Sequence, residues 1–265
     1  MDLVLEVADE YLLDRIYPSE LPRDDLTRQV LSITAVTMVA GYFLYFSGAG
    51  FAYKFLFDKK LMSHPRFQKN QVRLEIEQSV RSIPVMTLLT LPLFLAEVRG
   101  YSKTYTSLNE HGYAYLAWSV VWFVLFTDML IYWFHRWLHH PLLYAPLHKP
   151  HHKWIITSPF ASHAFHPVDG YIQSLPYHIF VMCFPIHRGV FLVLFLAVNY
   201  WTISIHDEFH VADNWWVNGS AHHAVHHEQF MYNYGQYLTL WDRLGGSFRQ
   251  PPPADLAHKQ GIKQA

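Results

Sequence analysis

Residues 112 to 140 read GYAYLAWSVVWFVLFTDMLIYWFHRWLHH, and this stretch decides the fold class. From Gly112 to Phe134 it carries one charged side chain, Asp128, and it then runs directly into His135. A helix of about 20 apolar residues crosses the hydrocarbon core of a bilayer. The stretch therefore predicts a membrane-spanning helix that delivers a cluster of histidines to the membrane surface.

The composition also favours a membrane protein. Hydrophobic residues make up 51% of the 265 residues and charged residues only 15%, against roughly 25% charged residues in an average soluble domain. The formal net charge of -1 gives no reason to expect a nucleic-acid partner, because phosphate binding needs clustered lysine and arginine. The single cysteine, Cys183, excludes a thiolate cluster, so a metal would have to be held by the 19 histidines, alone or with carboxylates.

Three further apolar stretches predict the remaining spans. Val30 to Tyr53 is uncharged and long enough for a first crossing. Ser82 to Ala96 is short and contains Pro84 and Pro92, which predicts a kinked span or a re-entrant segment. The region from Tyr171 to Ile205 is broken near its middle by proline and glycine, so we expect two short helices folded back as a hairpin. The fold class is thus all-α and multi-pass, with about four spans.

The chain is expected to form one domain with its histidine clusters on one side of the membrane. Its parts are a polar N-terminal segment (1–29), the spans with the first two clusters (30–205), the third cluster (206–250) and a tail (251–265). Loops rich in lysine and arginine tend to stay cytosolic, and the hairpin returns the chain to that side. The basic loop between the first two apolar stretches carries Lys54, Lys59, Lys60, Arg66, Lys69, Arg73 and Arg81.

Spaced histidines form three clusters that predict a metal centre. Within each cluster, histidines recur at i and i+3 or i+4, which places them on one face of a helix. Neutral imidazole suits iron, zinc and copper, and nine or ten imidazoles exceed the three or four ligands of a single zinc site. The clusters therefore predict two metals held by a helical cap. Their histidines are His135, His139 and His140, then His148, His151 and His152, and finally His222, His223, His226 and His227.

Other polar residues are expected to support this centre. Asp128 lies on the same helical stripe as His135, which makes it a candidate catalytic-site carboxylate that orients a metal-bound imidazole. His166 and His206 are expected to ligate a metal or to orient a ligand. For His163 and His210 a structural role is expected.

Several longer motifs resemble a known family. They are HKPHH at 148–152, PFASHAFHPVDG at 159–170, WTISIHD at 201–207, YNYGQY at 232–237 and WDRLGGS at 241–247. The spaced clusters resemble the fatty acid hydroxylase and sterol desaturase superfamily. The longer motifs are most similar to the sterol 5-desaturases within it.

The resemblance implies an enzyme that introduces the C5–C6 double bond into a Δ7-sterol. It implies two non-haem irons, O2 as co-substrate, and electrons from cytochrome b5 and an NAD(P)H-dependent reductase. It also implies a multi-pass protein of the endoplasmic reticulum membrane, in contact with membrane lipid and with its catalytic face in the cytosol. The implied metal ligands are His135, His139, His140, His148, His151, His152, His223, His226 and His227.

Other functions remain open from the residues alone. A hydroxylase or methyl oxidase of the same superfamily would use the same oxidant on another sterol, a fatty acid or a sphingolipid. A membrane haem protein could use pairs of histidines as axial ligands, and a metal transporter or a sterol binder are further alternatives. Transporters favour ligands near the bilayer midplane, whereas these clusters lie at the ends of apolar stretches, which favours chemistry at the membrane surface.

Overall fold

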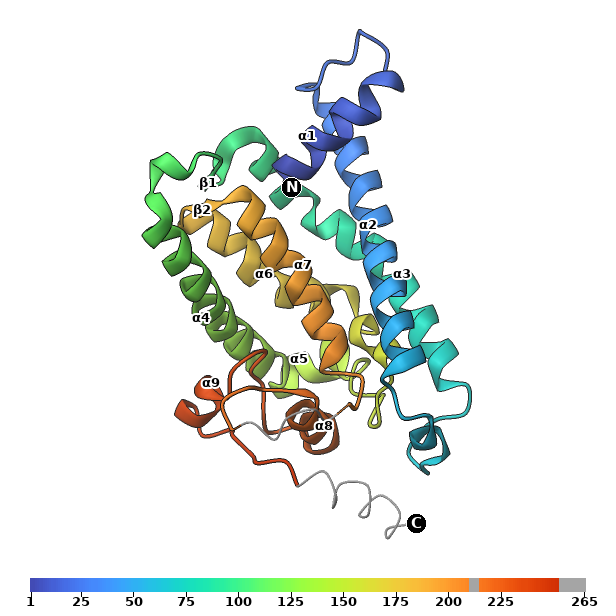
Figure 1. Cartoon of the computed structure of the whole chain (residues 1–265). Coiled ribbons are helices and arrows are strands. Elements are labelled where there is room, and N and C mark those ends of the chain that lie inside the picture. The colour runs from blue at the N-terminus through green and yellow to red at the C-terminus, as the bar shows by residue number, and fades with distance from the viewer. Residues whose placement is uncertain (210–214, 253–265) are drawn as a thin grey trace.

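The computed structural model describes residues 1–209 and 215–252, and helices dominate this part of the chain (Figure 1). Three of the helices are long and apolar enough to cross a membrane. The first and third correspond to the apolar stretches at Val30 and Gly112, and they confirm those two predicted spans. The three helices are α2 (Leu26–Phe55), α3 (Gln71–Ala96), which continues into the π-helical turn η3 (Glu97–Tyr101), and α4 (Gly112–Leu138).

The second span is longer than the apolar pattern predicts. α3 begins at Gln71, well before the apolar stretch, and it continues through both of its prolines. Two polar residues of its first turns, Gln71 and Glu75, face the interior of the protein. Gln71 donates a hydrogen bond to Glu75 over 2.7 Å, and the fully buried Glu75 accepts a hydrogen bond from Ser158. Polar side chains satisfied inside the protein thus hide the start of this helix from a hydropathy pattern.

The predicted hairpin is confirmed. Helices α6 (Pro167–Cys183) and α7 (Arg188–Ser204) run in opposite directions (Figure 1), and the short strand β2 (Ile186–His187) lies at their turn. β2 pairs in parallel with β1 (Thr104–Tyr105), which ties the turn to the segment before α4. The hairpin therefore brings the start of α6 and the end of α7 to the end of the bundle where α4 ends.

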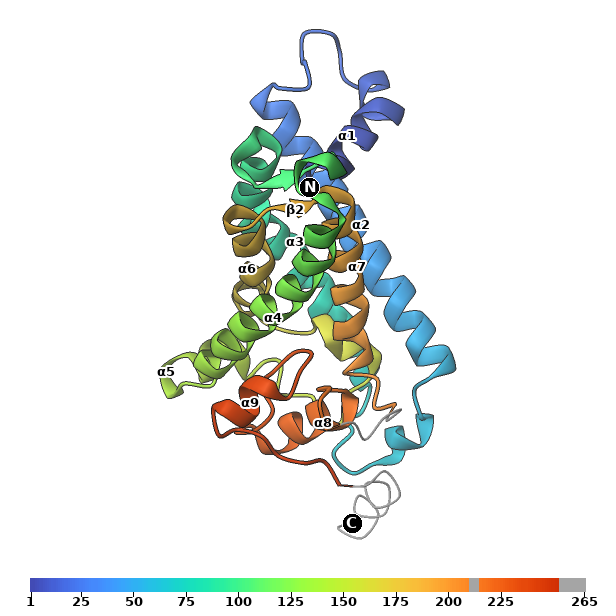
Figure 2. The same cartoon turned by 60° about the vertical axis from the view of Figure 1, so that its left-hand side comes forward.

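The short elements are divided between the two ends of the bundle (Figure 2). One end carries the N-terminal helix α1, and the opposite end carries the histidine-rich cap with α8 and α9. The short elements are α1 (Asp2–Tyr11), η1 (Leu13–Arg15), η2 (Lys59–Ser63), η4 (Leu108–Glu110), α5 (Pro141–Leu143), η5 (Tyr144–His148), η6 (Pro159–His163), α8 (Ser220–Gln229) and α9 (Leu240–Leu244).

Aromatic and aliphatic side chains hold the spans together. Phe123 of α4 packs edge-on against Phe180 of α6, with ring centroids 5.1 Å apart. On the other side of the bundle α2 and α7 approach closely at Gly48, where an added Cβ would lie 2.6 Å from Cδ1 of Ile203. These contacts fix the spans around a common interior, which positions the ends that carry the histidines.

The orientation of the bundle can be tested at Asn218, which begins an Asn-Gly-Ser glycosylation acceptor just before α8. Its side chain is buried, and its Nδ2, the atom that would carry a glycan, donates a hydrogen bond to the carbonyl of Gly235. We expect no glycan here after expression in a eukaryotic membrane, so endoglycosidase treatment should not change the mobility. An acceptor tripeptide inserted after the exposed Ser19, at the opposite end, should be glycosylated. A glycan on Asn218 would contradict a cytosolic cap.

Candidate metal centre

Nine of the predicted ligand histidines come together in two groups at the cap. In each group, one nitrogen of every ring lies within 4.8 Å of one nitrogen of every other ring. The first group consists of His135, His139, His148, His152 and His226, and the second of His151, His206, His223 and His227.

Neighbouring histidines in the sequence are divided between the two groups. The adjacent residues His151 and His152 point into different groups. On α8, His223 and His227 are separated by one helical turn and share the second group, whereas His226 belongs to the first. The turn after His148 and the helix α8 therefore each contribute histidines to both groups. The two groups form one centre with two compartments, one for each group.

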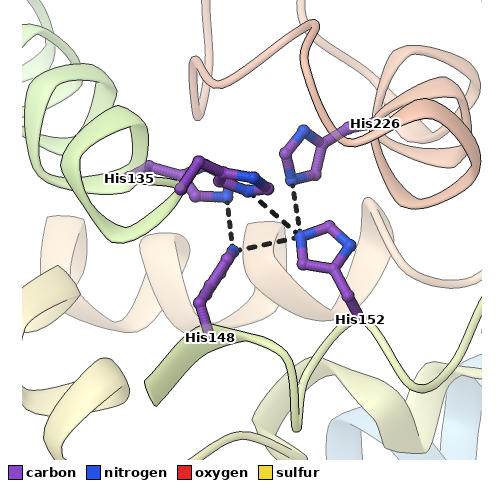
Figure 3. Close-up of side chains that lie close together, drawn as sticks. His135, His148, His152 and His226 are labelled. Carbon is purple, nitrogen blue, oxygen red and sulfur yellow. Dashed lines mark hydrogen bonds between the residues drawn. The ribbon is translucent and has the colours of Figure 1, made fainter. Parts of the chain in front are cut away.

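The first group converges through its Nε2 atoms (Figure 3). Nε2 of His148 lies 3.1 Å from Nε2 of His135, and Nε2 of His152 lies 3.1 Å from Nε2 of both His148 and His226. His139, which follows α4 directly, places its Nε2 3.2 Å from Nε2 of His152. Three segments, the end of α4, the stretch from His148 to His152, and α8, thus present their rings to one point.

The opposite ring nitrogen of three of these histidines is held by an acceptor. His135 Nδ1 bonds to the carbonyl of Tyr234 over 2.9 Å, and His226 Nδ1 bonds to the carbonyl of Tyr232 over 2.7 Å. A carbonyl can only accept, so each Nδ1 carries the proton and each Nε2 keeps its lone pair. His148 Nδ1 is held in the same way by the buried carboxylate of Asp169 at 2.8 Å.

The second group has the same construction. His206 Nε2 lies 3.3 Å from Nε2 of His151 and 3.0 Å from Nε2 of His223, and His227 Nε2 lies 3.1 Å from Nε2 of His223. His206 Nδ1 donates to the carbonyl of Thr202 over 2.7 Å, and His227 Nδ1 donates to the carbonyl of Trp154 over 2.9 Å. Their Nε2 atoms therefore also present lone pairs to the centre.

This donor set fits metal cations. His135 and His148 both keep lone pairs on Nε2, so their 3.1 Å separation is not a hydrogen bond. Lone pairs that face each other repel in a buried site, whereas a cation between them attracts both. Two groups of neutral imidazoles, each with ligand nitrogens within 4.8 Å of one another, match the preference of iron and zinc for nitrogen ligands.

Burial keeps these rings neutral. It lowers the pKa of His206 to about 4, and it lowers the pKa of His151, His152 and His223 well below the usual range. Neighbouring imidazoles add to the effect, since a proton on one ring disfavours a proton on the next. Near neutral pH the rings are thus in the form that binds a metal.

Two predicted ligands lie outside both groups. His140 is exposed, and its Nδ1 accepts a hydrogen bond from the backbone N–H of Leu142 at the start of α5. His166 caps α6, where its Nδ1 accepts from the backbone N–H of Val168. Both rings therefore serve helix starts in this structure. Of the remaining histidines, His222 is buried beside Phe248, whereas His210 lies outside the described residues.

Asp128 is buried at the predicted level of α4, but it holds a loop and not an imidazole. Its Oδ1 accepts hydrogen bonds from the backbone N–H of Gln236 at 3.0 Å and of Tyr237 at 2.7 Å. The same loop supplies the carbonyl of Tyr234 that holds His135. Asp128 therefore orients His135 indirectly, through the backbone of this loop. The helical stripe predicts a direct contact between the carboxylate and an imidazole.

Sequence reasoning missed two carboxylates that support the centre. Asp169 holds His148 directly, and Asp242 accepts the backbone N–H groups of Tyr234 and Gly235, each over 2.8 Å. Both lie in motifs that carried the family resemblance, at 159–170 and 241–247, and this was the available signal. Their partners are distant in sequence, so spacing alone could not have assigned them.

Comparison with known proteins identifies the family of this chain. Residues 120 to 247 match the pattern of the fatty acid hydroxylase family. Human lathosterol oxidase is 55% identical over 257 residues, which cover 95% of this chain and 86% of that protein. The chain belongs to the lathosterol oxidase family of sterol 5-desaturases. The Δ(7)-sterol 5(6)-desaturase of Schizosaccharomyces pombe is 50% identical over 256 residues, covering 96% of this chain and 85% of that protein. No solved structure gives a significant match.

The two-compartment centre of this sterol 5-desaturase family member can be tested at His152. His152→Ala removes the ring that contacts three others in the first group, so we expect metal content to fall from about two ions per chain to about one, with loss of turnover. His64→Ala, outside both groups, is the control and should keep both metals. Full metal content in His152→Ala would remove this residue from the centre. Metal loss in His140→Ala would add that exposed histidine to it.

The indirect role of Asp128 predicts a graded response. Asp128→Asn keeps an acceptor oxygen but loses the charge that strengthens the two backbone hydrogen bonds, and Asp128→Ala loses the acceptor altogether. We expect metal affinity to fall roughly 10- to 100-fold in the first variant and further in the second, as is typical for residues that orient ligands. Metal titration of the purified protein measures this. Equal affinity in all three proteins would show that the loop holds His135 without Asp128.

Proposed function

We propose that this protein is a sterol 5-desaturase that introduces the C5–C6 double bond into a Δ7-sterol. The observation that carries the proposal is a cavity of about 290 Å³ in the interior of the bundle. It is lined by His135 of the first imidazole group and by His151, His206 and His223 of the second. A substrate in this cavity would lie directly against the metal centre.

The cavity walls suit a hydrophobic substrate. Aliphatic and aromatic side chains from α2, α3, α6 and α7 line most of its length. Ala40 of α2 lines the cavity and is an exposed residue of a helix that lipid would surround. A sterol is rigid, largely apolar and dissolved in the membrane, so it matches both the lining and this lateral access.

The proposed reaction removes hydrogens that no acid or base in the protein can remove, because a ring C–H bond carries no acidic proton. Two irons, when bound by the two imidazole groups, would supply the oxidising chemistry with O2 and two electrons. The protein's own residues hold the geometry. Carbonyls of Tyr232 and Tyr234 and the carboxylate of Asp169 fix three rings of the first group. The apolar walls exclude water and present one part of the sterol to the centre.

We propose further that electrons arrive from cytochrome b5, which an NAD(P)H-dependent reductase reduces. Electrons would enter at the cap near the end of α4, since His139 of the first group is only partly buried and its ring centroid lies 5.4 Å from that of Tyr144. The basic loop between α2 and α3 lies at the same end of the bundle (Figure 1), which supports a cytosolic cap in an endoplasmic reticulum protein. The whole chain acts as one domain in this proposal, because α4, α7 and α8 all contribute ligands.

Sterol analysis tests the proposed reaction. Cells that lose the protein should accumulate the Δ7-sterol precursor and lack the Δ5,7 product, and the purified protein with iron, O2 and a reducing system should restore the product. Hydroxylated or demethylated product in place of the diene would point to another reaction of the superfamily. A Soret band in the purified active protein would point to haem and contradict the two-iron proposal.

A further inference from the structure

One polar side chain of the cavity wall lies between the two imidazole groups without belonging to either. It is Gln236, in the loop between α8 and α9. Tyr234, two residues before it, holds His135 of the first group through its carbonyl. Thr202, which accepts a hydrogen bond from the Gln236 side chain, holds His206 of the second group in the same way. Gln236 is therefore at the metal end of the cavity, next to residues that orient both groups.

The backbone of Gln236 is held at both of its polar atoms. Its N–H donates to Oδ1 of Asp128 over 3.0 Å, and its carbonyl accepts from Nε1 of Trp201 over 2.7 Å. Asp128 belongs to α4 and Trp201 to α7, so the loop is tied to two helices of the bundle. The side chain of Gln236 thus starts from a backbone that is fixed relative to the metal ligands.

The hydrogen bonds of Thr202 decide which way the Gln236 carboxamide faces. Thr202 Oγ1 donates its only hydrogen to the carbonyl of Val198 over 3.0 Å. It can then only accept from Gln236, so the amide atom 2.9 Å away is Nε2 and not Oε1. No donor among the described residues contacts this Oε1, and the Gln236 side chain is only partly buried. The oxygen is thus an acceptor that remains free for a ligand in the cavity.

We propose that Oε1 of Gln236 accepts a hydrogen bond from the 3β-hydroxyl of the sterol and so sets how far the substrate enters the cavity. This proposal rests on the proposed function. In a sterol a single ring carbon separates carbon 3 from carbon 5, so the hydroxyl has to bind close to the metal centre when carbon 5 faces it. The apolar side chain of the sterol then extends toward the opposite end of the cavity, where Phe94 and Phe191 line the wall.

The other two carboxamides of the cavity wall are less suited to this role. Gln173 donates over 2.7 Å to Asp169, the carboxylate that holds a metal ligand, so its substitution would disturb the centre. The side chain of Asn199 is engaged by the buried ring of His163. The side chain of Gln236 contacts neither imidazole group in its one hydrogen bond, so its substitution tests the anchor without removing a support of the metal.

The substituent at carbon 3 of the ligand tests the proposal in the unmodified, metal-loaded protein. Oε1 can only accept, so it favours a ligand that donates, whereas the second hydrogen of Nε2 would favour a ligand that accepts. A Δ7-sterol with the 3β-hydroxyl should therefore bind roughly 10-fold more tightly than its 3-ketone and its 3-deoxy analogue, because both of these leave Oε1 unpaired. Equilibrium binding measurements give the three Kd values. A 3-ketone that binds as tightly as the alcohol would overturn the proposal.

Gln236→Met removes the acceptor and keeps the length of the side chain. We expect the Kd of the alcohol to rise roughly 10-fold, while the Kd of the 3-deoxy analogue and the metal content stay unchanged. Gln68→Met is the matched control. Gln68 is also a partly buried glutamine whose Nε2 donates a hydrogen bond, to the carbonyl of Lys153 over 2.8 Å, but it does not line the cavity. The preference for the alcohol should therefore persist in this control.

These binding measurements separate the anchor from the proposed reaction, because they require no turnover. Equal losses for all three sterols in Gln236→Met, or an unchanged preference for the alcohol, would overturn the anchor. If this variant does not fold, the comparison of the three sterols in the unmodified protein still decides. An unmodified protein that forms no diene would refute the proposed function, and the Kd values would then still show whether Gln236 binds the hydroxyl.

Discussion

The centre depends on one constraint, that a buried imidazole which donates Nδ1–H to a fixed acceptor must present a lone pair at Nε2. His135, His148, His206, His226 and His227 all meet this condition, through four backbone carbonyls and one carboxylate. The acceptors come from loops and helix ends far apart in the sequence. The helical bundle, the hairpin and the cap loops all have to be in place before the rings can converge.

This arrangement costs stability without a metal. Facing lone pairs repel, and buried polar rings lose their hydration. A bound cation reverses the first effect, and the Nδ1 hydrogen bonds offset the second. The same loop that holds His135 and His226 is itself held from α4 by Asp128 and from α9 by Asp242. Metal binding and the packing of the cap against the spans are therefore coupled, as is usual where the ligands are spread over a chain.

Sequence patterns predict most of the histidines of this centre but not the contacts of the carboxylates that hold them, and the reason is physical. Helical periodicity of 3.6 residues locates the ligands, because His223 and His227 have to share a face. It also locates Asp128, yet not its partner, since the contact with Gln236 and Tyr237 joins segments more than 100 residues apart. Hydropathy finds α2 and α4 but not the first turns of α3, where Glu75 is buried and satisfied by Ser158. Patterns thus report local structure, and long-range polar contacts require coordinates.

The cavity explains how a strong oxidant could act at one position of a substrate that has many similar C–H bonds. Both imidazole groups contribute to the same end of the cavity, so the reacting atoms are chosen by how far the ligand enters and how it is rotated. Apolar walls set the depth poorly, because sliding along them changes little contact energy. A directional hydrogen bond near the metal centre would set depth and rotation together. Selectivity in such a site would then depend on the direction of polar contacts as well as on the shape of the walls.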